Sequence, residues 1–74
     1  MSSKNVIKSI DARVNVLNSE IKSIKTKMSN TERSLQLNPS NPKQLDYLHS
    51  LSKSLECKQA ELIMLLSRKN NLRS

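Results

Sequence analysis

Apolar residues recur every three or four positions through the first half of the chain, and this spacing restricts the folds that the chain can adopt. The steps between them alternate regularly between 3 and 4, and the last step is 7, with Thr31 at the skipped position. Such a seven-residue repeat places a single apolar stripe along an α-helix and is typical of helices that pack together. The stripe contains Ile7, Ile10, Val14, Leu17, Ile21, Ile24, Met28 and Leu35.

A second stripe, made of leucines, follows in the second half of the chain. Its members are Leu45, Leu48, Leu51, Leu55, Leu62, Leu65 and Leu72. Lys58 and Lys69 occupy the positions that the spacing skips. We expect a second helix with a leucine face, and we expect Leu48, Leu51, Leu55 and Leu65 to join the whole first stripe in the core.

The two stripes are separated by the segment Asn38-Pro39-Ser40-Asn41-Pro42. Each proline lacks an N–H group and disfavours the helical conformation of the residue before it, so this segment ends one helix and lets another begin. Pro42 suits the first position of the second helix, where a missing N–H costs nothing. Asn41 is then the N-cap, and Gln44 is its expected partner in a capping box.

These signals together predict an all-α fold, an antiparallel, coiled-coil-like hairpin of two helices. The predicted helices span residues 5–37 and 42–72, the turn spans 38–41, and residues 1–74 form a single unit. Arms of equal length that are joined by a short turn fold back on each other. We expect residues 70–74 to fray.

The composition argues against an enzyme and against a cofactor or metal site. The chain has no glycine, one cysteine and one histidine, which excludes phosphate-binding glycine loops, internal disulfides and most zinc sites. Cys57 is expected near the inner face as a small buried residue. No apolar run is long enough to span a membrane and no secretory signal is visible, so we expect a soluble, cytoplasmic protein.

The sequence contains more apolar residues than two paired helices can cover. Residues 62–66 are five consecutive apolar residues, which cover the whole circumference of a helix. Because a two-helix hairpin has no third layer, we expect these side chains to contact another chain. The predicted partner interface comprises Leu62, Ile63, Met64, Leu66, Val6 and Val16.

The net charge of +7, from 13 basic and 6 acidic residues, is spread over both halves of the chain. The densest basic stretch contains Lys22, Lys25, Lys27 and Arg33. Such charge can bind phosphate polymers, but Tyr47 is the only aromatic residue available for base stacking. A solvated basic face or an acidic partner protein is therefore a better interpretation than a nucleic-acid site.

Two segments resemble proteins of bacterial type III secretion. The turn Asn38-Pro39-Ser40-Asn41-Pro42 resembles the proline turn of needle subunits, although residues 58–74 lack the Lys-Asp pair of their C-terminal tail. The segment Ser52-Lys53-Ser54-Leu55-Glu56, with the apolar run that follows it to Leu66, resembles the second helix of the small needle-subunit co-chaperones. This resemblance implies a two-helix hairpin that binds a larger helical-repeat chaperone and helps to keep a needle subunit soluble.

Three functions are therefore compatible with the sequence. The first is a helical adaptor or co-chaperone that binds helical partner proteins. The second is a structural subunit that self-associates into a homo-oligomer or filament. The third is a basic hairpin that binds nucleic acid.

Overall fold

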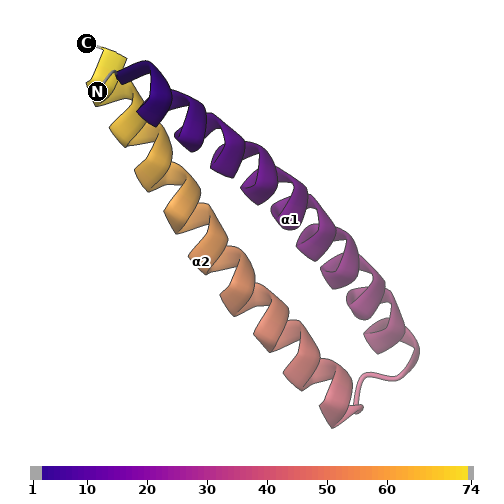
Figure 1. Ribbon diagram of the computed structural model, residues 1–74. Coiled ribbons are helices and arrows are strands. Elements are labelled where there is room, and N and C mark those ends of the chain that lie inside the picture. The colour runs from indigo at the N-terminus through magenta and orange to yellow at the C-terminus, as the bar shows by residue number, and fades with distance from the viewer. Residues whose placement is uncertain (1–2, 74) are drawn as a thin grey trace.

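The chain forms a hairpin of two long α-helices (Figure 1). The computed structural model describes residues 3–73, in which α1 spans Ser3–Leu37 and α2 spans Pro42–Arg73. The helices lie side by side and run in opposite directions, with the turn at one end (Figure 1). The molecule measures 55 × 16 × 15 Å, and its radius of gyration is 16.7 Å, against about 11 Å for a globular chain of this length. The predicted all-α antiparallel hairpin is confirmed, and it is a thin rod.

The helices extend slightly further than the sequence predicts. α1 begins two residues earlier, and α2 continues to Arg73. Residues 70–73, which we expected to fray, are helical, whereas Ser74 lies outside the described residues. Near this end, Lys69 Nζ lies 2.5 Å from Asp11 Oδ1, and this ion pair connects the last turns of α2 to the first turns of α1.

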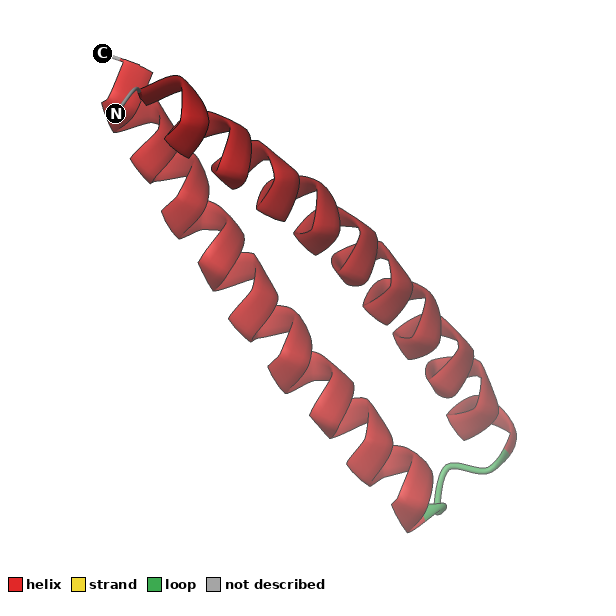
Figure 2. Cartoon of the chain, in the orientation of Figure 1, coloured by secondary structure: helices red, strands yellow, loops and turns green. Residues whose placement is uncertain are grey.

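A short turn, residues 38–41, joins the two helices (Figure 2). Hydrogen bonds from its backbone and from the Asn41 side chain hold it together. Asn41 Oδ1 accepts hydrogen bonds from the backbone N–H groups of Lys43 at 3.1 Å and Gln44 at 3.4 Å. These are N–H groups that the first turn of a helix otherwise leaves without partners. Asn41 is therefore the N-cap of α2, and Pro42 is its first residue.

The predicted capping box forms only in one direction. In a full box, the Gln44 side chain would accept a hydrogen bond from the backbone N–H of Asn41. That N–H instead donates to the carbonyl oxygen of Asn38 at 3.3 Å. The tight turn thus supplies the acceptor from the backbone, and the role that we predicted for the Gln44 side chain is wrong.

The two helices meet along a seam formed by the seven-residue repeats. All twelve residues predicted for the core lie on this seam, and none of them is exposed. Leu17 is fully buried at 0% exposure and marks the tightest part of the contact. The buried members are Ile10, Leu17, Ile21, Ile24 and Leu51, and the half-buried members are Ile7, Val14, Met28, Leu35, Leu48, Leu55 and Leu65.

Polar side chains fill the seam positions that the apolar repeats skip. Thr31 is buried, and its hydroxyl donates a hydrogen bond to the carbonyl oxygen of Lys27 at 2.8 Å. Lys58 and Lys69 are half-buried, and each extends to a carboxylate of α1. The seam is therefore continuous along both helices, although its apolar pattern is not.

Three side chains lie elsewhere than the sequence pattern predicts. Leu45 is exposed because the preceding residue, Gln44, occupies the seam position and is half-buried. Cys57 is exposed for a similar reason, because the seam position belongs to Lys58. Leu72 is exposed at the open end of the hairpin.

Candidate partner interface

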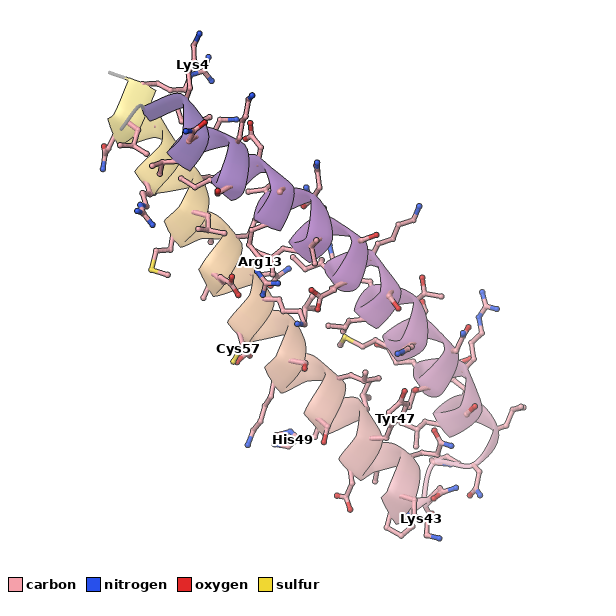
Figure 3. All side chains as sticks on the ribbon, viewed as in Figure 1. Lys4, Arg13, Lys43, Tyr47, His49 and Cys57 are labelled. Atoms are coloured by element: carbon pink, nitrogen blue, oxygen red, sulfur yellow. The ribbon has the colours of Figure 1, made fainter. Side chains whose placement is uncertain are left out.

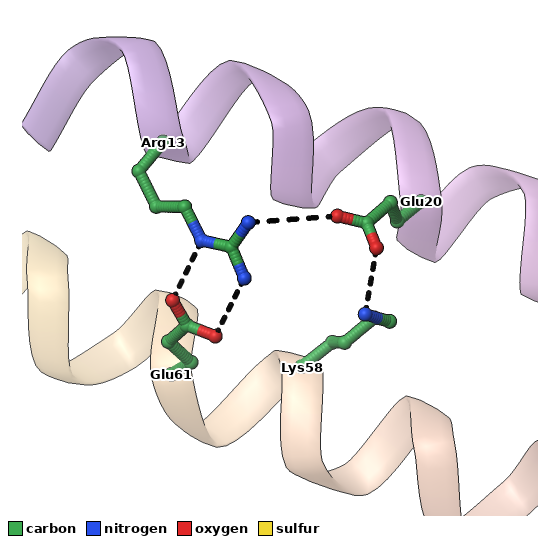
Figure 4. Close-up of polar contacts among 4 residues, drawn as sticks. All are labelled: Arg13, Glu20, Lys58 and Glu61. Atoms are coloured by element: carbon green, nitrogen blue, oxygen red, sulfur yellow. Dashed lines mark hydrogen bonds and ion pairs between the residues drawn. The ribbon is translucent and has the colours of Figure 1, made fainter.

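One edge of the seam, which we call the ion-pair edge, is bridged by Arg13, Glu20, Lys58 and Glu61 (Figure 4). Arg13 Nε and Nη2 donate to the two carboxylate oxygens of Glu61 at 2.8 and 3.0 Å. Arg13 Nη1 lies 3.8 Å from Glu20 Oε1, and Lys58 Nζ lies 2.6 Å from Glu20 Oε2. Four charges of alternating sign thus link α1 to α2 along this edge.

The hydrogen bonds between Arg13 and Glu61 shift the pKa values of both side chains. The bidentate hydrogen bond from Arg13 lowers the pKa of Glu61 below its ordinary value, and the charges of Arg13 and Lys58 act in the same direction. The same hydrogen bond raises the pKa of Arg13. Both groups therefore stay charged in the folded hairpin at neutral pH.

The opposite edge of the seam, which we call the open edge, contains four α2 residues spaced seven apart. They are Leu45, Ser52, Gln59 and Leu66. Leu45 and Leu66, the two end members, are 49% and 46% exposed, whereas Ser52 and Gln59 are half-buried. Residues spaced by seven lie on one side of a helix.

Two shallow hollows between the helices distinguish the edges. At the open edge, Leu45 and Ser52 of α2 line a hollow together with Met28 and Glu32 of α1. A separate hollow at the ion-pair edge is lined from α2 by Ser54 and Lys58 and from α1 by Glu20, Ser23, Ile24 and Lys27, with Leu51 from the seam. The open edge is therefore a distinct surface that both helices form.

The apolar run of α2 divides between the seam and the surface. Ile63 and Met64 are 66% and 65% exposed, and Leu66 is nearly half exposed. Leu62 is half-buried against the seam and offers less surface than we predicted. Because each residue turns the helix by about 100°, Ile63 and Leu66 lie toward the open edge while Met64 lies toward the other side.

The predicted interface residues of α1 do not join the patch formed by Ile63 and Leu66. Val16 is exposed, but it lies three residues after Arg13 and four before Glu20, on the ion-pair side of α1. Val6 is half-buried, so most of its surface is already covered. The six predicted residues are thus distributed over more than one face, which the linear sequence could not separate.

A basic groove runs along α1 beside the open edge. Its lining includes Lys22, Lys25 and Arg33, together with the polar residues Asn18, Thr26, Ser29 and Asn30, and contains no carboxylate. All three basic side chains are exposed, and within residues 3–73 none of them forms an ion pair. The groove is a surface of uncompensated positive charge.

The described residues contain no arrangement of side chains for metal binding, because no three His, Cys, Asp or Glu residues gather among them. His49 and Cys57 project from the outer side of α2, whereas Arg13 points across toward α2 (Figure 3).

Within the same part of the chain, neither helix combines the length and the apolar character that crossing a bilayer requires.

Sequence reasoning missed the ion pairs that connect the helices. The partners of Asp11, Glu20 and Glu61 on α2 or α1 across the seam lie 38 to 58 residues away in the sequence, so spacing within one helix does not indicate them. One sequence feature could have indicated these ion pairs: Lys58 and Lys69 stand at the positions that the second stripe skips. A lysine at such a position can keep its stem in the seam while its ammonium group extends to the edge.

The chain was compared with known protein families, curated proteins and solved structures. No protein-family model, curated protein or solved structure gives a significant match to the chain.

Proposed function

We propose that the hairpin is a small, non-catalytic adaptor that binds a helical partner protein. The observation that carries this proposal is the exposure of Ile63, Met64 and Leu66 within one run of five apolar residues. Covering such side chains would stabilise a complex by roughly 1.5–3 kcal/mol each before the cost of association is subtracted. A partner helix would supply the third layer that the hairpin lacks.

The surface area of the hairpin supports this proposal. The chain exposes 5691 Å², whereas a compact protein of this mass exposes about 4,600 Å². The difference arises because two helices bury only one stripe each. A third helix along the rod would cover part of that surplus without any rearrangement of the seam.

The charge of the hairpin favours a different protein over a second copy of this chain. Two copies would each bring a net charge of +7 to the contact. Like charges oppose association, whereas an acidic partner would be attracted and steered to the surface. The proposed partner is therefore acidic as well as helical.

The resemblance to needle-subunit co-chaperones suggests a more specific form of this proposal. The hairpin would act in the cytoplasm with a larger helical-repeat chaperone, and the pair would cover the apolar helix of a needle subunit until export. That role needs no chemical step, because covering an apolar surface is enough to prevent premature assembly.

The test is isolation of the complex from the native cell, with Ile63→Asp compared with Leu37→Asp. Both variants place a new carboxylate at an exposed apolar position, but Leu37 is 90% exposed at the end of α1, far from the apolar run. We expect the parent and Leu37→Asp to retain a helical protein partner and Ile63→Asp to lose it.

Three results would contradict the proposal. Retention of the partner by Ile63→Asp would show that the apolar run does not form the interface. Self-association of the purified chain without another protein would support the structural-subunit alternative. Binding to nucleic acid that weakens with salt and is unaffected by Ile63→Asp would support the third function.

A further inference from the structure

From the two different edges of the seam we infer that the partner is an acidic amphipathic helix that docks along the open edge and completes a three-helix bundle. This inference rests on the proposed function and specifies which surface is used and what chemistry the partner has. It depends on Leu45 and Leu66, which are exposed at the two ends of the open edge, and on the basic groove of α1 between those ends. Glu32 lies next to Leu45, and Asp11, paired with Lys69, lies at the Leu66 end.

The ion-pair edge is unsuited to a third helix. Arg13, Glu20, Lys58 and Glu61 already bridge the helices there, with the shortest contacts at 2.6 and 2.8 Å. A helix placed over them would remove water from four charges, whereas within residues 3–73 the open edge has one such bridge, the Lys69–Asp11 pair near Leu66. Desolvation of charged groups is costly even when they are paired. The partner is therefore expected on the opposite edge.

The open edge has the spacing that a docking helix requires. Leu45 and Leu66 are separated by 21 residues, a multiple of the seven-residue repeat, so they lie on one side of α2 about 32 Å apart. Ile63 extends the apolar surface beside Leu66, at the end of the edge that is far from the turn. Ser52 and Gln59, between the two leucines, are half-buried and leave a shallow floor.

The charge of α1 specifies the flank of the partner. Ile24 and Leu51 line one hollow, so Lys25 and Ser52, the next residues on each helix, lie at a similar height along the rod. Lys22 and Lys25 therefore border the middle of the open edge, and the groove that they line contains no carboxylate. Asp or Glu side chains at the middle of that flank of the partner would pair with these lysines, away from Glu32 in the hollow beside Leu45.

A nucleic acid fits the same edge less well. The described part of the open edge has exposed leucines at both ends and no Phe, Tyr or Trp side chain for base stacking. A second copy of the chain would place one basic groove near another. Both occupants are outcomes that the following experiment distinguishes.

The experiment uses the full chain and a synthetic helix of about 24 residues, long enough to span the edge. This probe has leucines at the first and fourth positions of each seven-residue repeat and glutamates on one flank. A peptide of the same composition in scrambled order is the control probe. Affinity is measured by titration calorimetry, and complex formation by the gain in helical circular dichroism.

We expect the ordered probe to bind and the scrambled peptide not to bind. Leu45→Asp should weaken binding by about tenfold or more, since one buried leucine is worth at least that factor, whereas Leu37→Asp should not. The charge reversal Lys22→Glu with Lys25→Glu should weaken binding and reduce its dependence on salt. The control pair Lys43→Glu with Lys53→Glu changes the net charge equally and should have little effect.

Absence of binding by the ordered probe, equal binding by both peptides, or unchanged affinity in Leu45→Asp would overturn the inference. Tighter binding to a single-stranded oligonucleotide of about 20 nucleotides, or dimerisation in sedimentation experiments that Leu45→Asp abolishes, would also overturn it. Binding of the native partner by two variants distinguishes the adaptor function from the open-edge inference. If Met64→Asp releases the native partner and Leu45→Asp does not, the adaptor function stands and only the open-edge inference is wrong.

Discussion

The guanidinium group of Arg13 and the carboxylate of Glu61 form two parallel hydrogen bonds, at 2.8 and 3.0 Å, across the seam between α1 and α2. The two residues are 48 positions apart in the sequence. Their planar groups match in shape, which makes this geometry directional as well as attractive. The pair therefore helps to set the register of one helix against the other.

We predict that the Arg13–Glu61 pair makes the stability of the hairpin depend on acid. Because Arg13 lowers the pKa of Glu61 in the folded state, this contribution is present above the ordinary glutamate pKa of about 4.3. It is lost as the pH falls through the lower folded-state pKa. The melting temperature, measured by circular dichroism, should thus fall more between pH 5 and pH 3 in the parent than in Glu61→Gln. Parallel profiles for the two proteins would contradict this prediction.

We predict that Leu17→Ala largely unfolds the isolated hairpin. Leu17 is fully buried, and truncation of such a leucine costs about 2–5 kcal/mol, which is comparable with the stability of a chain this small. The helical signal at 222 nm and 25 °C should collapse. Val16→Ala is the matched control because the neighbouring Val16 is exposed, and its unfolding curve should stay close to that of the parent.

We predict that Asn41→Ala destabilises the hairpin by about 1 kcal/mol through loss of the N-cap of α2. This corresponds to a melting temperature roughly 4–8 °C lower in a domain of this size. Asn38→Ala should have a smaller effect, because Asn38 contributes its backbone carbonyl to the turn. If the two alanine variants have the same melting temperature, the side chain of Asn41 does not have the capping role that its contacts indicate.

We predict that Lys58→Leu raises the melting temperature. Lys58 occupies a seam position between Leu55 and Leu62, where a leucine would continue the apolar contact. The lost pair with Glu20 is partly exposed and worth about 0–1 kcal/mol, and Glu20 keeps Arg13 as a neighbour. Lys53→Leu, on the exposed surface of α2, should give no increase. A lower melting temperature for Lys58→Leu would show that the ion pair outweighs the apolar contact.

The sequence contained enough information to predict the hairpin itself. The regular spacing around Leu17 and Ile21 identifies the inner face of α1, and the prolines with Asn41 place the turn, because these signals are local. The leucine face was less certain at its start, since Leu45 and Gln44 are adjacent and both fit a helical spacing with Leu48. Only the packed helices show that Gln44 takes the seam position.

The two edges of the seam could not be predicted from either repeat. A seven-residue repeat defines which residues face the partner helix, but it does not define which residue of α1 lies beside which residue of α2. Without that register, Arg13 and Glu61 have no evident relationship, and Met64 cannot be separated from Ile63 by face. The division into an ion-pair edge and an open edge therefore emerges only from the tertiary structure.

The most direct test of the adaptor function is photo-crosslinking in the native cell, with a photoreactive amino acid in place of Ile63 and, in a second variant, in place of Leu37. We expect a covalent adduct from position 63 with a helical segment of a different protein, identified by mass spectrometry, and no such adduct from position 37. Adducts from position 63 only with copies of this chain or with nucleic acid, or no adduct beyond that from position 37, would contradict the adaptor function.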